Sequence, residues 1–428
     1  MHDPHLPRSA PAPTLSARRP IQEWRLVLGV FWITQFVESL GVSQVYALLP
    51  TYLRQMGVAE ADRVPFVGLF GSLVFVLGLP LVPLWGVWAD KYSRKAVIVR
   101  SCLVEAAVFG VAALAREPWQ MAISMLLIGF QLGNTGVMLA GIRDVAPRRR
   151  IGTAIALFGA ASPIGFAAGP ALAGLMIDGF GLAIPAVYLF STVLSLGTAL
   201  LVAFGTREVR PEVIPVGPVL RLAFGAVRGV LGDPVVRRLF AIYGLVFLAS
   251  QVSRPYTPLL VERIVGSGAG LAASIGLVMG AASLVGAGVS PLIGALSDRV
   301  GFRPVLVAAL AGGSVASLAM ALAPALGPLA VAAAVLGTAA ATTGAMVFSL
   351  LATEVPSERR STTLNLVYLP LYVAGIIGPT IGSGLATVAG TSGPFLAGAV
   401  VFGFGAAALG LRRRAAVSRT PVVGPPEG

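Results

Sequence analysis

The sequence predicts an all-α integral membrane protein whose twelve transmembrane helices form two pseudo-symmetric six-helix bundles. Composition is the first reason, because 56% of the 428 residues are hydrophobic and only 11% are charged. The mean hydropathy of +0.86 is typical of a membrane protein rather than a soluble one. The second reason is that apolar runs of about twenty residues, each long enough to cross a bilayer as a helix, recur from end to end. The third is a set of features that repeat after 208 or 209 residues.

Twelve apolar runs follow one another along the chain. The first, 26–50, is too long for the core of a signal peptide, and it follows a tail rich in proline and arginine that we expect to be disordered and uncleaved. The other runs lie near 66–88, 97–115, 119–142, 151–177, 183–205, 238–261, 271–296, 304–323, 328–352, 362–388 and 393–411. They predict an N-terminal tail, a first bundle, a linker, a second bundle and a C-terminal tail at 1–25, 26–205, 206–237, 238–411 and 412–428.

Lysine and arginine predict the orientation of these spans, because cytoplasmic loops carry the excess of basic residues. If the N-terminal tail is cytoplasmic, the inside segments hold roughly 26 of the 31 basic residues. The outside segments then hold Arg54, Arg63, Arg116 and Arg263, and Arg254 falls within a span. We therefore expect both termini in the cytoplasm and the protein in the cell (inner) membrane. This topology also accounts for the net charge of +13, so the charge does not predict nucleic-acid binding.

An internal repeat divides the spans into two sets of six. The stretch GVWADKYSRKAV at 86–97 is matched by GALSDRVGFRPV at 294–305, and both lie between the second and third helices of a set. Pro50 and Pro258 repeat at the same displacement of 208, whereas Pro147 with Pro356, and the Gly-Pro pairs that begin at 169 and 378, repeat at 209. Four features at nearly one displacement predict two copies of one six-helix unit.

Cysteine, histidine and lysine usage argues against several chemistries. The single cysteine, Cys102, lies within an apolar run, so no internal disulfide can form. His2 and His5 both lie in the N-terminal tail, which argues against a standard zinc site and against a histidine relay in the membrane. The two lysines, Lys91 and Lys95, lie in no phosphate-binding GxxxxGK[ST] loop. No nucleophile and base pair stands out either, so we expect no enzyme, no metal and no cofactor.

The loop GVWADKYSRK resembles the signature loop between helices 2 and 3 of major facilitator superfamily transporters, and the resemblance to the family covers nearly all of 26–411. The resemblance implies the major facilitator fold of two six-helix bundles. The signature, GxxxD[RK]xG[RK][RK], is matched at Gly86, Asp90, Lys91, Arg94 and Lys95. Ser93 stands where the family has glycine.

The second copy of this loop keeps most of the signature. Its matching residues are Gly294, Asp298, Arg299, Gly301 and Arg303. Phe302 stands where a basic residue is expected, so the second loop is expected to lack one ionic contact.

The resemblance implies that these loops act as latches at the cytoplasmic ends of the helices. It implies a contact from Asp90 to the positive end of helix 11, near Ser361, and an ion pair from Arg94 to Asp144 at the end of helix 4. Such contacts would form only while the inside is closed, so they would favour the outward-facing state.

The fifth span narrows the resemblance to a branch of the family. Its stretch PIGFAAGPALAGL is similar to the antiporter motif GxxxGPxxGG of drug:proton exporters, with matches at Gly165, Gly169, Pro170 and Gly174 and a departure at Ala173. Small residues let two helices approach closely, and a proline frees a carbonyl and bends its helix. Ordinary helix packing is the alternative interpretation of this stripe.

One position departs from the exporter pattern. Exporters of this branch usually carry an arginine four residues before a glycine of helix 4. If Gly133 is that glycine, the partner position holds Gly129. The coupling role that the resemblance implies for such an arginine is therefore not expected here.

Ionisable side chains inside the spans are the candidates for coupling, because charges in hydrocarbon are costly and usually functional. Glu38 lies near the middle of the first span, where desolvation disfavours the carboxylate and makes proton uptake feasible. Glu105 lies as deep, in the third span, which the resemblance makes peripheral scaffold. Arg254 is a candidate either to neutralise Glu38 or to hold an anionic group of a substrate. A structural pair or a snorkelling side chain is the alternative for all three.

Residues at helical spacing supply candidates for the wall of a substrate cavity, which the resemblance places between helices 1, 4, 7 and 10. The candidates are Phe31, Gln35, Tyr46, Gln131, Asn134, Met138, Tyr243, Gln251, Arg254, Thr342, Met346 and, on helix 11, Asn365, Tyr368 and Tyr372. Aromatic and methionine-rich walls with few charges favour amphiphilic or apolar molecules over sugars. Interhelical packing is the usual alternative for such stripes.

The linker between the bundles contains the stretch GPVLRLAFGAVRGVL. This stretch places Leu220, Phe224, Val227 and Leu231 on one side of a helix, which predicts a short helix lying at the cytoplasmic surface of the membrane.

Together these features predict a secondary transporter that exports an amphiphilic, drug-like compound in exchange for protons by alternating access. Its partners would be a small-molecule substrate, protons and the lipid bilayer, without nucleic acid, and the protein would be monomeric. An exporter or facilitator of sugar-like or other polar metabolites is the first alternative. A non-transporting receptor or scaffold is the second, disfavoured because both signature loops are largely intact.

Overall fold

The computed structural model describes residues 23–211, 214–354, 366 and 369–417. Within these ranges the chain forms helices and no strand. Twelve helical spans among the described residues are long and apolar enough to cross a membrane. The predicted fold class is therefore confirmed. Three of the predicted site residues, Ser361, Asn365 and Tyr368, lie outside the described residues.

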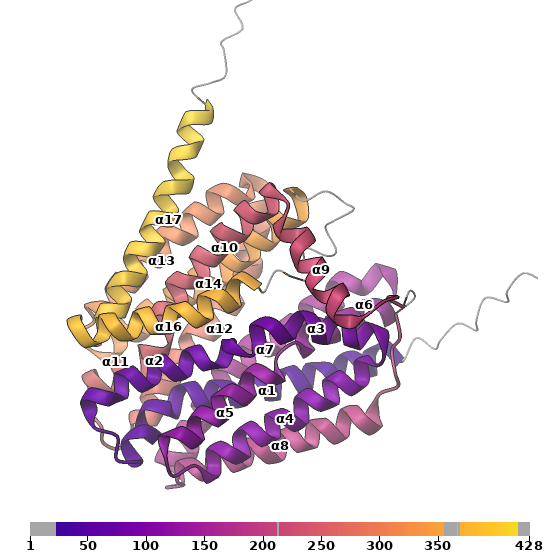
Figure 1. The fold of residues 1–428 in the computed structure, drawn as a ribbon. Helices are drawn as coiled ribbons and strands as arrows, with labels where there is room; N and C mark the ends of the chain where they lie inside the picture. The colour runs from indigo at the N-terminus through magenta and orange to yellow at the C-terminus, as the bar shows by residue number, and fades with distance from the viewer. Residues whose placement is uncertain (1–22, 212–213, 355–365, 367–368, 418–428) are drawn as a thin grey trace, which may run out of the picture.

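The first six spans are coloured indigo to magenta in Figure 1. Three of them are single helices: α1 (Glu23–Gln55), α4 (Arg94–Leu114) and α8 (Ile184–Gly205). The second and fourth spans are each broken in two, into α2 (Glu60–Val76) and α3 (Gly78–Lys91), and into α5 (Pro118–Gln131) and α6 (Asn134–Val145). The fifth consists of the 3₁₀ turn η1 (Arg148–Arg150), α7 (Ile151–Gly174) and the π-helical turn η2 (Leu175–Gly179).

The last six spans are coloured rose to yellow in Figure 1. The seventh span is broken into α10 (Pro234–Ser253), the 3₁₀ turn η3 (Arg254–Tyr256) and α11 (Thr257–Val265). The others are α12 (Leu271–Val300), α13 (Phe302–Ala321), α14 (Leu326–Glu354), α16 (Leu369–Ala389) and α17 (Gly393–Val417).

The helix α9 (Val219–Leu231) joins the two sets of spans and packs against α3 and α10 (Figure 1). Leu220, Phe224 and Leu231 are exposed on it, whereas Val227 packs against buried side chains of the last six spans. An amphipathic helix with large apolar side chains left uncovered is typical of the membrane interface.

The two sides of the bundle differ in how the first and last six spans meet. We call the side that carries α9, the loop at 92–93 and η1 the linker face, and the opposite side, with the loops at 56–59, 115–117 and 266–270, the distal face. Buried apolar side chains near the distal face form one cluster that includes both Phe70 and Phe395. Near the linker face each half has its own cluster, one around Phe158 and the other around Phe402. The two halves therefore share a core at the distal face.

Small residues let helices of the two halves approach closely near the distal face. The main contacts between the halves are those of α2 with α16 and of α7 with α12. A Cβ atom at Gly276 of α12 would lie 2.8 Å from the carbonyl oxygen of Pro170 on α7. A Cβ atom at Gly68 of α2 would lie 2.6 Å from Cβ of Ser383 on α16. Larger side chains at these glycines would force the halves apart.

Polar contacts between the halves add to this closure. Glu262 on α11 accepts hydrogen bonds from Arg54 of α1, at 2.5 Å, and from Arg63 of α2, at 3.2 Å. The carboxylate of Asp178 on η2 accepts the backbone N–H of Ala273 in the first turn of α12, at 2.8 Å. We call Arg54, Arg63 and Glu262 the distal lock, because these ion pairs must break before the halves can separate at this face.

The distal lock predicts a shift of conformation when its acid is neutralised. Hydrogen bonds to charged groups contribute about 1.5–3 kcal/mol each, so Glu262→Gln should favour the state that is open at the distal face by about tenfold or more. The measurement is the distance distribution between spin labels on cysteines placed at the exposed positions Ala61 and Thr387, on α2 and α16. The native Cys102 is buried and should not react.

A matched control is Arg263→Gln, which removes a hydrogen bond to Ser392 inside the last six spans. It should leave the label distances unchanged. Distances in Glu262→Gln equal to those in the unmodified protein would contradict the role given to the lock.

Candidate functional site

Glu38 lies in the middle of α1 and is buried, with 7% of its surface exposed. Its carboxylate accepts a hydrogen bond of 2.8 Å from the side-chain amide of Asn134, the first residue of α6. The oxygen of the same amide accepts the backbone N–H of Thr135 at 2.9 Å, which fixes the orientation of the amide. Glu38 makes no ion pair with any residue that the structure describes.

Neutral polar side chains surround this carboxylate. Gln35, one turn earlier on α1, accepts a hydrogen bond from the hydroxyl of Thr135 at 3.0 Å. Gln131, at the end of α5, is 1% exposed, and its side-chain amide lies close to the Glu38 carboxylate without forming a well-aligned hydrogen bond to a described residue. The structure thus brings Gln35, Glu38, Gln131 and Asn134 together as one cluster, which we call the carboxylate cluster. A ligand or a water molecule could complete the hydrogen bonding of the Gln131 amide.

Glu105 lies at the same depth as Glu38, on α4. A Cβ atom at Gly41 of α1 would overlap the ring of Phe109 of α4, so these two positions lie at one depth. Glu38 lies about one turn nearer the linker face than Gly41, and Glu105 lies about one turn nearer it than Phe109. Glu105 is 1% exposed, and its Oε1 atom has no hydrogen-bond partner among the described residues. A second carboxyl is therefore buried in the first six spans.

Arg254 lies at the break between α10 and α11, away from Glu38. Its guanidinium carbon lies 5.9 Å from the ring centre of Tyr46 on α1 and 4.8 Å from that of Phe166 on α7. The residue is exposed although it lies within the seventh span. Its side chain therefore reaches from the last six spans to two rings of the first six. Of the two roles expected for Arg254, neutralising Glu38 does not fit this position.

Several candidates for a cavity wall lie in the packed interior instead. Phe31 and Met138 belong to the apolar cluster of the first half, and Tyr243 and Met346 to that of the last half. Ordinary packing accounts for these four. Thr342 is 2% exposed, and Gln251 packs against Gly378 of α16. Tyr372 packs against Phe75 of α2, with 5.9 Å between ring centres.

The signature loop forms an ion-pair network within the first six spans. Arg94 binds Asp144 at 2.6 Å, the contact that the resemblance implied, and also binds Asp90 at 2.9 Å. Lys95 donates to the carbonyl of Thr206 at 2.7 Å, just after α8. Gly86 has no neighbour that a Cβ atom would meet within 4 Å, so packing does not demand a glycine there.

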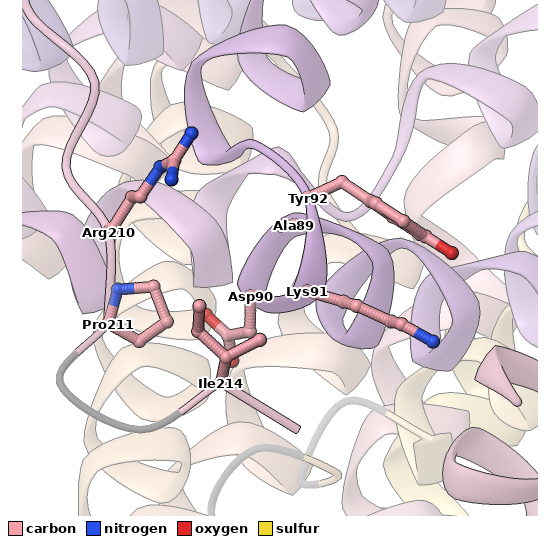
Figure 2. Close-up of a pocket in the computed structure, with 7 residues that line it drawn as sticks. All are labelled: Ala89, Asp90, Lys91, Tyr92, Arg210, Pro211 and Ile214. Atoms are coloured by element: carbon pink, nitrogen blue, oxygen red, sulfur yellow. The ribbon is translucent and has the colours of Figure 1, made fainter. Parts of the chain in front are cut away.

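The linker that follows α8 also binds this loop. Lys91 donates to the carbonyl of Gly217 at 2.7 Å. Asp90 and Lys91 line a pocket of about 270 Å³ together with Arg210 and Ile214 of the linker. Figure 2 shows Ile214 next to Asp90 and the Lys91 side chain extending away from Arg210. The loop is therefore held by the linker at the linker face.

Ser93 now has a structural explanation. Its backbone is extended, with φ of −163°, so the position does not require glycine. Its hydroxyl caps α4 by accepting the N–H of Ala96 at 2.9 Å, and it donates to the carboxylate of Glu208. Glu208 also accepts the backbone N–H of Arg94 at 2.9 Å. Serine is a preferred N-cap, and a carboxylate at a helix N-terminus is stabilising.

The second copy of the loop differs in these respects. Gly301 has φ of +90°, a conformation that favours glycine. Phe302 packs against the apolar cluster of the last half, which explains why a basic residue is absent there. Asp298, Arg299 and Arg303 are exposed, and Gly294 has open space around it.

The antiporter-motif helix α7 packs on both sides. Cβ atoms at Gly165 and Gly169 would overlap the backbone of α1 at Phe36 and Leu40, the segment that carries Glu38. On its other side, a Cβ atom at Gly174 would lie 2.7 Å from Cα of Ala273 on α12. Pro170 packs on α12 as well, through the contact with Gly276 given above. This helix therefore joins the carboxylate cluster to the interface between the halves.

The departure at Gly129 follows from close packing between the second and fourth spans. A Cβ atom there would lie 2.7 Å from the carbonyl oxygen of Val74 and 3.2 Å from the backbone nitrogen of Gly78. An arginine at this position would force the two broken spans apart.

Sequence reasoning missed four groups of functional interest. Arg100 lies inside α4 and binds the break between α5 and α6, yet only Glu38, Glu105 and Arg254 stood out as charges within spans. Glu208 and the distal lock were missed because their partners are far away in sequence. The breaks themselves were missed, although the glycine at position 133 was a signal in the sequence for one of them. In the structure Gly133 has φ of +105°.

Comparison with known proteins places these features in a family. The family model described as Major Facilitator Superfamily matches residues 31–274 and 239–426. The multidrug resistance protein MdtG of Citrobacter koseri is 31% identical over 292 residues, which cover 67% of this chain and 70% of that protein. The multi-drug resistance efflux pump PmrA homolog of Lactococcus lactis is 26% identical over 363 residues, 85% of this chain and 89% of that protein.

Solved structures of transporters share the fold at low identity. A bacterial homolog of the human lysosomal transporter Spinster, in an inward-facing and unoccupied conformation, aligns with a TM-score of 0.73 at 16% identity, over 94% of this chain and 99% of that one. The human organic anion transporter MFSD10 aligns with a TM-score of 0.69 at 20% identity, over 92% of this chain and 100% of that one.

The packing of α7 predicts a loss of stability when its glycines are enlarged. Gly169→Ala inserts a methyl group into backbone atoms of α1, so it should lower the free energy of unfolding by about 1–3 kcal/mol. Gly159→Ala is the control on the same helix, because nothing lies within 4 Å of a Cβ atom there. It should raise the stability by about 0.5–1 kcal/mol through helix propensity. Unfolding in mixed micelles, followed by circular dichroism, measures both, and equal effects would contradict the close contact.

Proposed function

Because the chain belongs to the major facilitator superfamily, we propose that it is a proton-coupled antiporter that exports amphiphilic, drug-like compounds by alternating access. Membership makes it a membrane transporter rather than an enzyme, and the relatives named as multidrug resistance proteins support export of such compounds. The linker face would be cytoplasmic, because the basic residues gather there, with both termini inside the cell membrane. The domain boundary would lie in the linker at 206–237.

The observation that carries this proposal is the environment of Glu38. Its carboxylate is buried in a span, and its partner is the neutral amide of Asn134 rather than a cation. An arginine partner would hold the charged form firmly, whereas an amide stabilises it only modestly. The group can therefore change its charge during a cycle, which is the requirement for a proton carrier. Glu105, at the same depth and without a partner for Oε1, is the candidate for a second exchangeable proton.

A mechanical link from Glu38 to the interface supports coupling. The antiporter-motif helix α7 packs against α1 at Phe36 and Leu40, on either side of Glu38, and against α12 of the other half. Protonation changes the favoured environment of Glu38, so movement of α1 would be passed to α12 through α7. The distal lock would hold the outside shut while the proton leaves toward the cytoplasm and the substrate enters from it.

Arg254 would bind an anionic or electron-rich group of the substrate. Its guanidinium lies beside the aromatic rings of Tyr46 and Phe166 of the other half, and the residue is exposed. No acidic residue in the described chain pairs with it. A cation beside aromatic rings suits an amphiphile that carries a flat apolar body and a negative group.

Replacement of Glu38 should uncouple transport. In liposomes with an internal fluorescent pH reporter, the unmodified protein should move protons when ethidium, tetraphenylphosphonium or fluorescein crosses the membrane. Glu38→Gln should reduce this proton movement at least about tenfold, because an amide cannot exchange a proton. Asp62→Asn, at an exposed acid of α2, is the control and should behave as the unmodified protein.

Each other outcome of this experiment overturns a part of the proposal. Proton movement that survives Glu38→Gln removes Glu38 as the carrier. Flux that no pH gradient affects indicates a facilitator, binding without flux indicates a receptor, and a preference for lactose over the amphiphilic probes indicates a carrier of polar metabolites.

Replacement of Arg254 should change charge selectivity. Arg254→Gln should slow fluorescein transport by about 10- to 150-fold, the equivalent of one charge-assisted hydrogen bond of about 1.5–3 kcal/mol. Ethidium transport should change much less, because a cation gains nothing from the guanidinium. Arg116→Gln, at an exposed arginine of the distal face, is the control. Equal losses for both probes would show that Arg254 has a structural role only.

A further inference from the structure

The fourth span is interrupted beside the carboxylate cluster, and the interruption leaves backbone carbonyls without helical partners. In an unbroken helix the carbonyls of Phe130, Gln131 and Leu132 would accept N–H groups four residues later. Gly133, with φ of +105°, ends this pattern, and α6 begins anew at Asn134. In the bilayer interior each unpartnered carbonyl costs free energy, so another donor must be present.

Arg100 of α4 supplies the donors. Its guanidinium donates to the carbonyl oxygen of Phe130 at 2.9 Å and to that of Gln131 at 3.1 Å, and a longer contact of 3.5 Å reaches Leu132. The neighbouring hydroxyl of Ser101 donates to Gln131 as well, at 2.8 Å. A positive charge at the C-terminal end of α5 also complements the helix dipole.

Aromatic rings fix the position of this guanidinium. Its carbon lies 3.8 Å from the ring centre of Trp85 on α3 and 5.4 Å from that of Phe130 on α5. The two rings are themselves in edge contact, with centres 5.6 Å apart. Arg100 therefore binds the second, third and fourth spans together at the break.

The break determines where Asn134 lies. Thr135 would donate its N–H to Gln131 in a continuous helix, but here it donates to the side-chain oxygen of Asn134. The nitrogen of that side chain consequently faces Glu38 and donates to it at 2.8 Å. If the break closed, the N–H of Thr135 would donate to the carbonyl of Gln131 instead. The hydrogen bond that orients the side-chain amide of Asn134 would then be lost.

The second half of the chain provides an internal comparison. Gly78 and Gly129 approach each other closely between the second and fourth spans, and Gly286 and Gly337, each 208 residues later, do so between α12 and α14. At the same displacement Arg100 corresponds to Ala308. The corresponding helix α14 runs unbroken from Leu326 to Glu354. The break and the arginine thus occur together in the first half and are both absent from α13 and α14.

We propose that Arg100 is a positioning residue for proton coupling, which holds the fourth span open so that Asn134 contacts the carboxylate of Glu38. The close packing of Gly129 leaves no room for an arginine on the fourth span itself, and Arg100 reaches the same region from α4. The inference rests on the proposed function, because it assigns Arg100 a purpose only if Glu38 exchanges protons.

The test measures the ionisation of Glu38 directly, without a transported substrate. The carboxyl C=O stretch of the purified protein is followed by infrared difference spectroscopy as the pH is varied, and the Glu38 band is assigned by its loss in Glu38→Gln. Arg100→Gln should shift the pH midpoint of this band in the same direction as Asn134→Leu, by at least half as much. The double variant Arg100→Gln with Asn134→Leu should shift it no further than Asn134→Leu alone, because both changes remove one contact.

Conservative and control variants separate positioning from mere stability. Arg100→Lys should restore much of the unmodified midpoint, since a lysine also donates to carbonyls. Ser101→Ala, a mild change in the same cluster, should give a smaller shift in the same direction and keeps the test valid if Arg100→Gln does not fold. Ser124→Ala removes the hydrogen bond from α5 to Val108 of α4, away from the break, and should leave the midpoint unchanged.

The result that would overturn the proposal is an unchanged midpoint in Ser101→Ala and in whichever Arg100 variant folds, even if thermal stability falls. Additive shifts in the double variant would overturn it too. Failure of proton-coupled transport itself is a separate result, seen in the liposome experiment with the unmodified protein, and it would leave the infrared midpoints interpretable.

Discussion

The hydrocarbon layer contains no water, so each backbone N–H and C=O within a span needs a partner from the protein. Continuous helices such as α1 and α12 meet this requirement by themselves. The broken spans do not, and polar side chains lie at the breaks of the fourth and seventh spans. Arg100 and Asn134 lie at the break of the fourth span, and Arg254 lies at the break of the seventh. The same constraint therefore accounts for the polar groups at these two breaks, one of which, Asn134, contacts Glu38 of the continuous helix α1.

Association between the halves depends on a different balance. Lipid offers apolar surfaces as favourable as those of the protein, so close packing and polar contacts must hold the halves together. At the distal face Gly68 and Gly276 allow close packing, while Glu262 joins both halves through two arginines. Close packing is lost within a small displacement, and ion pairs can re-form in water. At this face the close packing and the ion pairs therefore add to the apolar core that the two halves share.

Hydropathy predicted the spans well, because membrane thickness fixes the length of an apolar run. The ion pair of Arg94 with Asp144 was implied by the resemblance of the loop at 86–97 to the family signature, and the structure contains it. Candidates for a cavity wall could not be told from packing positions in the sequence. Phe31 and Met138 lie on helical stripes like those of Gln35 and Asn134, yet they pack in the core. In a span that is apolar on all sides, periodicity does not distinguish a wall from a packing face.

Two other residues show where sequence patterns mislead. Ser93 departs from a family glycine, yet its φ of −163° is accessible to any residue, so the departure carries no strain. Arg100 follows closely on the basic loop and reads as part of it, although its side chain turns inward to the break of the fourth span. Whether a basic residue near a span end snorkels to water or turns inward depends on partners in other spans. Those partners, the carbonyls of the broken fourth span, exist only in the folded protein.

The internal repeat places equivalent residues opposite each other where the two halves meet. Arg54 and Glu262 are 208 residues apart and form an ion pair, and Tyr46 and Arg254, also 208 apart, are in contact. Two identical copies would place like charges together at the first pair and two tyrosines or two arginines at the second. Attraction between equivalent positions therefore requires the copies to differ there. The same divergence gives Glu38 and Glu105 the counterparts Val246 and Gly313. The packing glycines repeat, whereas these charges within the spans do not. The first half therefore carries the two buried acids, and the last half carries Arg254, which contacts rings of the first half.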